Sequence, residues 1–142
     1  YVKDVSEAFK EYLGYYGRAY LPKEVLQPEE AVEVLSSLGA TVCLAHPMLQ
    51  KLPEGWLEAF IERLLPCGLT AIEAYHSEHS EAASRRCLEL ARHYGLGVSG
   101  GSDYHGTNKP RIRLGKGYGS LRVPYSVLED LREMRARRGL PC

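Results

Sequence analysis

Short apolar runs alternate with segments of helical periodicity along most of the chain. Three runs have the length and composition of buried strands, at 41–45, 69–72 and 97–99. Apolar residues at helical spacing predict an N-terminal helix and further helices over 29–38, 54–65, 80–94 and from 125 or 126 to 138. Because helices and strands alternate, we expect an α/β fold in which parallel strands are joined by right-handed crossovers and flanked by helices.

The periodicity also predicts which side of each helix faces the sheet. For 29–38 the predicted inner face is Ala31, Val34, Leu35 and Leu38, with Gly39 ending the helix. For 54–65 it is Leu57, Phe60, Ile61, Leu64 and Leu65. For 80–94, capped by Ser80, it is Ala83, Cys87, Leu90, Ala91 and Tyr94.

Polar residues suited to chemistry follow each of the three predicted strands. His46 comes after the first, Glu73 and His76 after the second, and Asp103 and His105 after the third. Alternate residues of an extended segment point the same way, so Asp103 and His105 can reach one metal ion. Taken alone, such a pair is more often a solvated turn, and His46 a hydrogen-bonded strand end. Their recurrence at the carboxyl ends of parallel strands, where α/β proteins keep their active sites, favours a shared site.

Composition limits the class of protein. The 142 residues are 44% hydrophobic and carry no net charge, which predicts one globular domain over 1–142 and excludes a nucleic-acid tail. No apolar stretch approaches a membrane span. Cys43, Cys67, Cys87 and Cys142 show no Cys-x-x-Cys spacing, so we expect reduced cysteines in a cytoplasmic protein. Because the chain begins at Tyr1 rather than methionine, we expect a piece of a longer protein.

A basic stretch follows the third strand. It contains Lys109, Arg111, Arg113, Lys116 and Arg122, with no acidic residue between Asp103 and Glu129. Such a run is usually a solvated loop. A basic loop that leaves a candidate phosphate site is nevertheless well placed to attract anions.

Several of these motifs together resemble a known family. Ala-His-Pro at 45–47, the run Ile-Glu-Ala-Tyr-His-Ser-Glu-His-Ser at 72–80 and Gly-Ser-Asp-Tyr-His-Gly at 101–106 resemble the C-terminal half of PHP-domain (polymerase and histidinol phosphatase) phosphoesterases. The chain looks most like the branch that hydrolyses phosphate from nucleoside 3′,5′-bisphosphates and short oligonucleotides. The resemblance implies the C-terminal part of a distorted (β/α)7 barrel with parallel strands and flanking helices.

The resemblance also implies roles for individual residues. His46, Asp103 and His105 would be metal ligands, and Asp103 and His105 catalytic. The phosphate-binding residues would be His79, with His76 and Lys109 beside it. Glu73 is either a carboxylate that orients a ligand or a structural residue. The cofactors would be divalent metal ions, namely manganese, iron or zinc, with two or three in a complete site.

This sequence also departs from the family pattern. The family's opening His-x-His, its following Ser-Asp-Gly and its early His and Glu ligands have no counterpart here. We therefore expect half of a metal site, an inactive isolated chain, and exposed sheet edges that favour self-association. Two other functions stay open: a non-catalytic remnant that binds nucleic acid or a protein partner through 109–122, and a metal hydrolase of carbon–nitrogen bonds.

Overall fold

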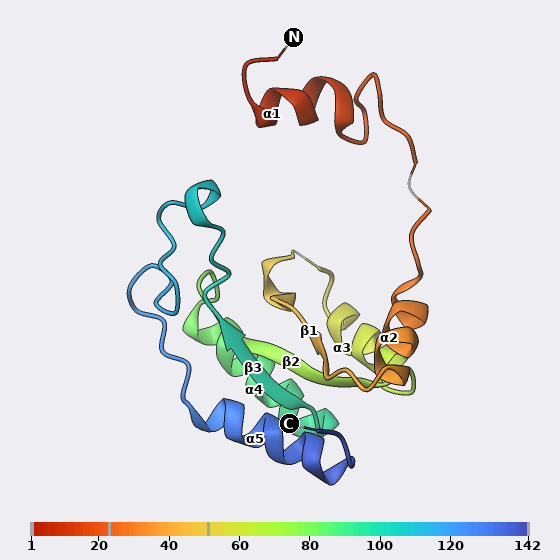
Figure 1. Ribbon diagram of the computed structural model, residues 1–142, viewed down its shortest axis with the longest axis vertical. Coiled ribbons are helices and arrows are strands. Elements are labelled where there is room, and N and C mark those ends of the chain that lie inside the picture. Colours follow the sequence, from red (N-terminus) through yellow and green to blue (C-terminus); the bar gives the residue numbers. More distant parts are fainter. Residues whose placement is uncertain (1, 23, 51, 142) are drawn as a thin grey trace.

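A parallel sheet with helices packed around it forms the body of the molecule in the computed structural model, which describes residues 2–22, 24–50 and 52–141 (Figure 1). The strands are β1 (Val42–Leu44), β2 (Leu69–His76) and β3 (Gly97–Gly101). The longer helices are α2 (Pro28–Ser37), α3 (Trp56–Leu64), α4 (Glu81–Tyr94) and α5 (Ser126–Arg137). Shorter helical segments are α1 (Val5–Ala8), η1 (Phe9–Leu13), η2 (Pro47–Leu49) and η3 (Gly106–Asn108).

The strand order within the described residues is β1-β2-β3, and both pairings are parallel. The crossovers run through α3, between β1 and β2, and through α4, between β2 and β3. The predicted α/β class with parallel strands and flanking helices is therefore confirmed. β2 is longer than its sequence run indicated, because it continues through Glu73 to His76.

Mostly aliphatic side chains from the strands and from the helices α2, α3 and α4 form the core. Its most buried members are Ile61, Leu64, Ile72, Ala74, Cys87, Leu90 and Ala91. The inner faces predicted for 54–65 and 80–94 are confirmed, since they supply Leu57 and Ile61 from α3 and Cys87 and Leu90 from α4. Ser80 caps α4, and its side chain accepts a hydrogen bond from the Ala83 N–H.

The inner face predicted for 29–38 is wrong. Val34, Leu35 and Leu38 are 51%, 47% and 78% exposed, whereas Val32 is only 7% exposed. The reason is the close approach of α2 to the turn before β2, where a Cβ added at Gly68 would clash with the side chain of Ser36. Val32 and Ser36 are four residues apart and therefore share the face that packs inward.

The N-terminal segment stands apart from this body. In Figure 1, α1 and η1 (red) extend away from the sheet, and the contacts recorded for them join the two to each other. Tyr15 and Tyr16 follow them and are 70% and 95% exposed. Within the described ranges, no helix combines the length and apolar character needed to cross a membrane.

The cysteines behave as core or surface thiols. Cys43, Cys67 and Cys87 are free. Burial raises the pKa of Cys87 to about 11, so this thiol stays protonated and unreactive at neutral pH. Cys142 lies outside the described residues.

The C-terminal helix α5 closes the body against β3. Gly97 permits this approach, because a Cβ at that position would lie 2.9 Å from Leu131 Cδ2. Arg135 then fastens the helix to the chain before β1, since its Nη1 donates to Gly39 O at 3.1 Å and to Thr41 Oγ1 at 2.9 Å. The same guanidinium donates twice to Pro141 O. One side chain thus joins α5, the start of β1 and the C-terminal segment.

We predict that Arg135→Ala lowers the free energy of unfolding by about 1–3 kcal/mol, because partly buried acceptors lose a charged donor. Urea unfolding followed by circular dichroism measures this loss. The control is Arg137→Ala, which removes an exposed pair with Glu133 on the same helix. Its effect should stay within about 0.5 kcal/mol. Equal losses for the two variants would contradict the role given to Arg135.

Candidate metal and phosphate site

The polar residues predicted for the site gather at the carboxyl edge of the sheet. Tyr75 and His76 pair with Gly100 and Gly101, so β2 and β3 end side by side. His46 follows β1 by two residues, and its ring centroid lies 5.4 Å from that of His76. The three strand ends therefore bring their polar side chains to one region, as expected of a parallel sheet.

Glu73 ties the end of β1 to β2. Its Oε2 accepts a hydrogen bond of 2.7 Å from the His46 backbone N–H. The carboxylate thus holds the main chain that carries the imidazole, which agrees with an orienting residue rather than with a ligand. This contact was not predictable, because it depends on the turn that the chain makes at His46.

That turn is strained. His46 has φ 31° and Asp103 has φ 52°, and they are the only non-glycine residues with positive φ in the part of the chain that the structure describes. A left-handed backbone crowds Cβ against the following carbonyl and costs about 1–2 kcal/mol per residue. Such conformations collect at functional sites, where the surrounding structure holds them. Both strained residues are predicted metal ligands.

Asp103 lies among cationic and imidazole groups. Its Oδ2 accepts a hydrogen bond of 2.5 Å from Lys109 Nζ, and this bond holds the pKa of the Asp103 carboxyl below its usual range. The same bond raises the pKa of Lys109. The Nζ also lies 3.8 Å from Glu78 Oε2. An ammonium group therefore stands between two carboxylates, at a position whose charge environment favours a cation.

The donor atoms near this ammonium fit a divalent metal. One atom each of His76, Glu78 and Asp103 lie within 4.8 Å of one another. Carboxylate and imidazole donors suit manganese, iron and zinc. Glu78 was missed as a candidate in the sequence, although it lies two residues after His76, the same spacing that identified Asp103 and His105. The region of Asp103 and Glu78 is thus where the chain could hold a metal.

Hydrogen bonds set the tautomer of His76. The Glu78 N–H donates to His76 Nδ1 at 3.1 Å, so the neutral ring carries its proton on Nε2. Burial lowers the pKa of His76, which favours the neutral form. Nε2 is buried without a hydrogen-bond partner among the described residues, 3.7 Å from Asp103 Oδ2. Despite its place in the cluster of donors, His76 is therefore arranged as a proton donor to an anion rather than as a ligand.

His79 and His105 have the opposite arrangement. His79 Nδ1 lies 3.1 Å from Ala74 O, and His105 Nδ1 lies 2.8 Å from Asp103 O. A carbonyl only accepts, so both rings hold their proton on Nδ1 and leave the lone pair of Nε2 free. A ring fixed in this way is prepared to bind a metal. For His79, a contact with a phosphate oxygen would need the imidazolium form.

The loop after β3 is held in place by serines that the sequence did not single out. Ser77 Oγ donates to Ser102 O at 2.5 Å, and Ser102 Oγ accepts from the Gly115 N–H at 3.0 Å. Ser102 itself is only 6% exposed. These bonds fix the residue before Asp103 from both sides, which helps to maintain the strained backbone of Asp103.

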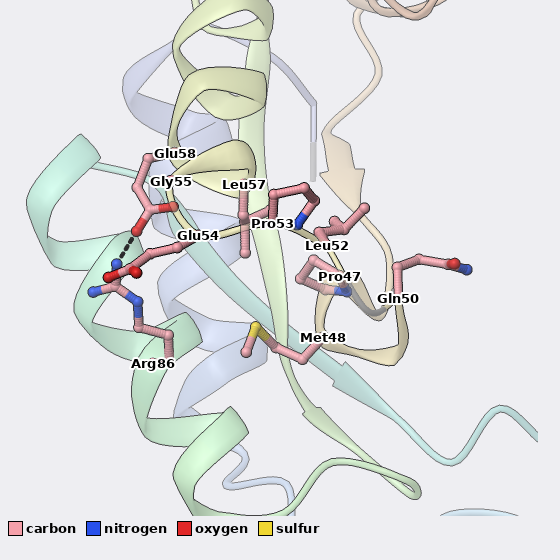
Figure 2. Close-up of a pocket in the computed structure, with 10 residues that line it drawn as sticks. All are labelled: Pro47, Met48, Gln50, Leu52, Pro53, Glu54, Gly55, Leu57, Glu58 and Arg86. Carbon is pink, nitrogen blue, oxygen red and sulfur yellow. Dashed lines mark hydrogen bonds and ion pairs between the residues drawn. The ribbon is translucent and has the colours of Figure 1, made fainter.

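Two of the cavities near the strand ends have charged residues in their linings. One, of about 460 Å³, includes His76 and His79 in its lining, whereas Lys109 lies away from it beside Asp103. The structure therefore divides the three predicted phosphate-binding residues between two places. The other cavity, of about 500 Å³, lies beyond Pro47 and Met48 (Figure 2). Among the described residues its one guanidinium, that of Arg86, is paired with Glu58, so the described part of the lining offers no free cation to a ligand.

We predict distinct tautomers for the neighbouring rings of His76 and His79. In long-range ¹H–¹⁵N spectra of the neutral rings, His76 should show protonated Nε2 and His79 protonated Nδ1, because their partners are an amide N–H and a carbonyl. His93 is exposed and meets Tyr94 edge-to-face, and it serves as the control. It should show a mixture of tautomers. The same tautomer for His76 and His79 would contradict the assignment.

We also predict that His46→Gly is more stable than His46→Ala by about 1–2 kcal/mol, since glycine adopts positive φ without a Cβ clash. Both variants lack the imidazole, so their difference isolates the backbone. Thermal unfolding of the two variants measures it. Trp56→Gly and Trp56→Ala, at the first position of α3, provide a control pair in which alanine should be the more stable.

Known proteins resemble this chain in sequence and fold. No family model matches it. It is 39% identical over 85 residues to a phosphoribosyl 1,2-cyclic phosphate 1,2-diphosphodiesterase of Eggerthella lenta, covering 58% of this chain and 30% of that protein. It is 30% identical over 112 residues to the 5′-3′ exoribonuclease Rnm of Escherichia coli, covering 79% of this chain and 38% of that protein. The chain thus spans well under half the length of these relatives.

Two solved structures share the fold. One is an amidohydrolase from Chromobacterium violaceum, with a TM-score of 0.68 and 23% identity, covering 94% of this chain and 46% of the other. The second, from Bifidobacterium adolescentis, is assigned as a metal-dependent phosphoesterase and has a TM-score of 0.64 and 24% identity, covering 92% and 44%. The ordered motifs, the parallel α/β fold and the named relatives agree, and the chain is similar to PHP-domain phosphoesterases.

Proposed function

We propose that this chain is the C-terminal part of a metal-dependent phosphoesterase that hydrolyses phosphate esters of nucleotides or short oligonucleotides. The observation that carries the proposal is the convergence of Glu78, Asp103 and the histidines at the carboxyl edge of the sheet. The names of the two curated relatives, a cyclic phosphate diphosphodiesterase and an exoribonuclease, support this substrate class.

In this proposal Asp103, His105 and His46 hold divalent metal, with Glu78 as an added candidate. Manganese, iron or zinc would acidify a bound water and neutralise phosphate charge. The tautomer of His105 leaves Nε2 ready to coordinate. Asp103 stays ionised because of its bond to Lys109, and an ionised carboxylate is the form that binds a cation.

The neighbouring residues would bind the substrate. His76 presents a buried Nε2–H that lacks a partner among the described residues, and a phosphate oxygen would satisfy it. Lys109 is attached through a flexible stem and can exchange its carboxylate partner for a phosphate oxygen. Glu73 keeps the His46 backbone in position through its hydrogen bond. His79 would either bind a phosphate oxygen as an imidazolium or coordinate a metal through its free Nε2.

The chain alone would form an incomplete site. The predicted ligands of this chain are fewer than a cluster of two or three metals needs, and the chain spans 30% and 38% of its two relatives. We therefore propose that further ligands come from sequence outside these 142 residues. β1 and β3 each have one edge without a strand partner among the described residues, which supports self-association of the isolated chain.

A hydrolase of carbon–nitrogen bonds is the alternative in the same class, since one solved neighbour is named an amidohydrolase. At 23% identity that neighbour shows the fold alone. The placement of Lys109 and of a free Nε2–H beside the carboxylates favours an anionic phosphate over a neutral amide.

The test compares the 142-residue chain with a longer protein that contains it and supplies the His-x-His motif. With manganese, we expect the longer protein to hydrolyse nucleotide phosphates and the short chain to stay at background. His105→Ala in the longer protein should lower turnover at least about a hundredfold, because it removes a metal ligand from an exposed loop. Circular dichroism should show an intact fold.

His93→Ala is the matched control, an exposed histidine on α4, and it should retain normal turnover. Turnover by the short chain, or normal activity of the His105→Ala variant, would show that the half-site proposal is wrong. Hydrolysis of amide substrates without phosphatase activity would favour the carbon–nitrogen alternative.

A further inference from the structure

A side-chain hydrogen bond continues the contact between β2 and β3 beyond the end of their backbone pairing. The last paired residues are His76 and Gly101. Ser77 and Ser102 follow them, and the Ser77 hydroxyl donates to the carbonyl oxygen of Ser102 at 2.5 Å. The direction of this bond is fixed, because a carbonyl oxygen can only accept. The two strand ends are thus joined at the residue that immediately precedes Asp103.

The peptide unit that receives this bond also contains the Asp103 nitrogen. A peptide bond is planar, so the Ser102 carbonyl and the Asp103 N–H turn together. Rotation of that plane relative to the Asp103 Cα changes the φ of Asp103, which is 52°. Positive φ is unfavourable for a residue that has a Cβ. A bond that holds the Ser102 carbonyl therefore opposes the rotation that would relieve the strain at Asp103.

The loop after β3 requires a small side chain at position 77. Gly117 of this loop is buried, and a Cβ added there would clash with the side chain of Ser77. Gly117 and Arg113 exchange two backbone hydrogen bonds, of 2.8 and 2.9 Å, which close the loop. The loop backbone therefore lies against the Ser77 hydroxyl. A serine fits this position because it is small and still supplies a donor.

Ser102 has a second contact, which acts on a different part of the chain. Its Oγ accepts a hydrogen bond of 3.0 Å from the Gly115 N–H, and this bond holds the loop. The Ser77 hydroxyl instead holds the Ser102 carbonyl. Of these two contacts, the one from Ser77 acts directly on the peptide plane that sets φ of Asp103.

The proposed metal site depends on where the Asp103 carboxylate lies. Its Oδ2 is 3.7 Å from His76 Nε2, and one of its oxygens belongs to the group of close donor atoms that includes Glu78. Rotation of the Ser102–Asp103 peptide plane would move this carboxylate relative to the donors that β2 and the residues after it supply. The geometry of the site is therefore sensitive to the bond from Ser77.

We propose that Ser77 is a positioning residue of the metal site, which acts through the Ser102 carbonyl to hold the Asp103 carboxylate where it can bind metal. The inference rests on the proposed function and adds to it a residue that the sequence did not single out. Removal of a residue that orients a metal ligand typically lowers metal affinity about ten- to a hundredfold.

NMR of the 142-residue chain without metal tests the conformational step. The nuclear Overhauser effect between HN and Hα of Asp103 is strong at positive φ, and we expect it to weaken in Ser77→Ala. Ser37→Ala is the matched control, because the Ser37 hydroxyl also donates to a carbonyl, that of Val34 at 2.8 Å. It should leave the Asp103 signal unchanged. An unchanged Asp103 signal in Ser77→Ala, or loss of its fold by circular dichroism, would overturn the proposal.

Manganese titration of the longer protein provides the second readout. By isothermal titration calorimetry, Ser77→Ala should bind manganese at least about tenfold more weakly, whereas Ser37→Ala should match the wild-type protein. Turnover of p-nitrophenyl phosphate by Ser77→Ala should fall at limiting manganese and recover at saturating manganese, with KM unchanged, since the residue acts on the metal site.

Wild-type manganese affinity of Ser77→Ala, or turnover that saturating manganese does not restore, would contradict the role given to Ser77. Absence of turnover by the longer wild-type protein would instead overturn the proposed function. The NMR signal of Asp103 and the calorimetry would still decide whether Ser77 positions this carboxylate.

Discussion

The arrangement of the whole site depends on β2, which pairs with both other strands of the described sheet. The Glu73 carboxylate of β2 accepts a hydrogen bond from the backbone N–H of His46, which follows β1. Ser77, the residue after β2, donates a hydrogen bond from its hydroxyl to the carbonyl of Ser102, which precedes Asp103. The strand therefore positions both strained residues through one hydrogen bond on each side. A shift of β2 by one residue would reverse its faces and separate these groups.

Backbone strain and carboxylate repulsion both cost free energy at the site. Positive φ at His46 and Asp103 costs free energy. Repulsion between the neighbouring carboxylates of Asp103 and Glu78 adds a second cost. Lys109 offsets the second cost by bonding to Asp103 and approaching Glu78. A divalent cation would neutralise the same carboxylates more completely, and for this reason we place the proposed metal site at the position of the lysine ammonium.

The sequence predicted the elements and their order because strand and helix periods differ so clearly in this chain. It predicted the wrong face of α2, since four apolar residues at helical spacing outweighed Ser36, whose small size permits contact with Gly68. It identified His76, Asp103 and His105 as candidates through their positions after strands. It could not give their tautomers or the positive φ of Asp103, because both depend on bonds to backbone groups of a folded turn.

Arg85 and Arg86, neighbours on α4, show that the number of basic residues in a sequence does not reveal which of them stay unpaired in the fold. Successive residues of an α-helix point about 100° apart. That rotation directs Arg86 toward Glu58 on α3 and Arg85 toward the hollow formed with Arg122. The first guanidinium is neutralised within the fold, and the second keeps its donors for a ligand. Helix phase, more than the number of basic residues, therefore determines which arginine of α4 is neutralised within the fold.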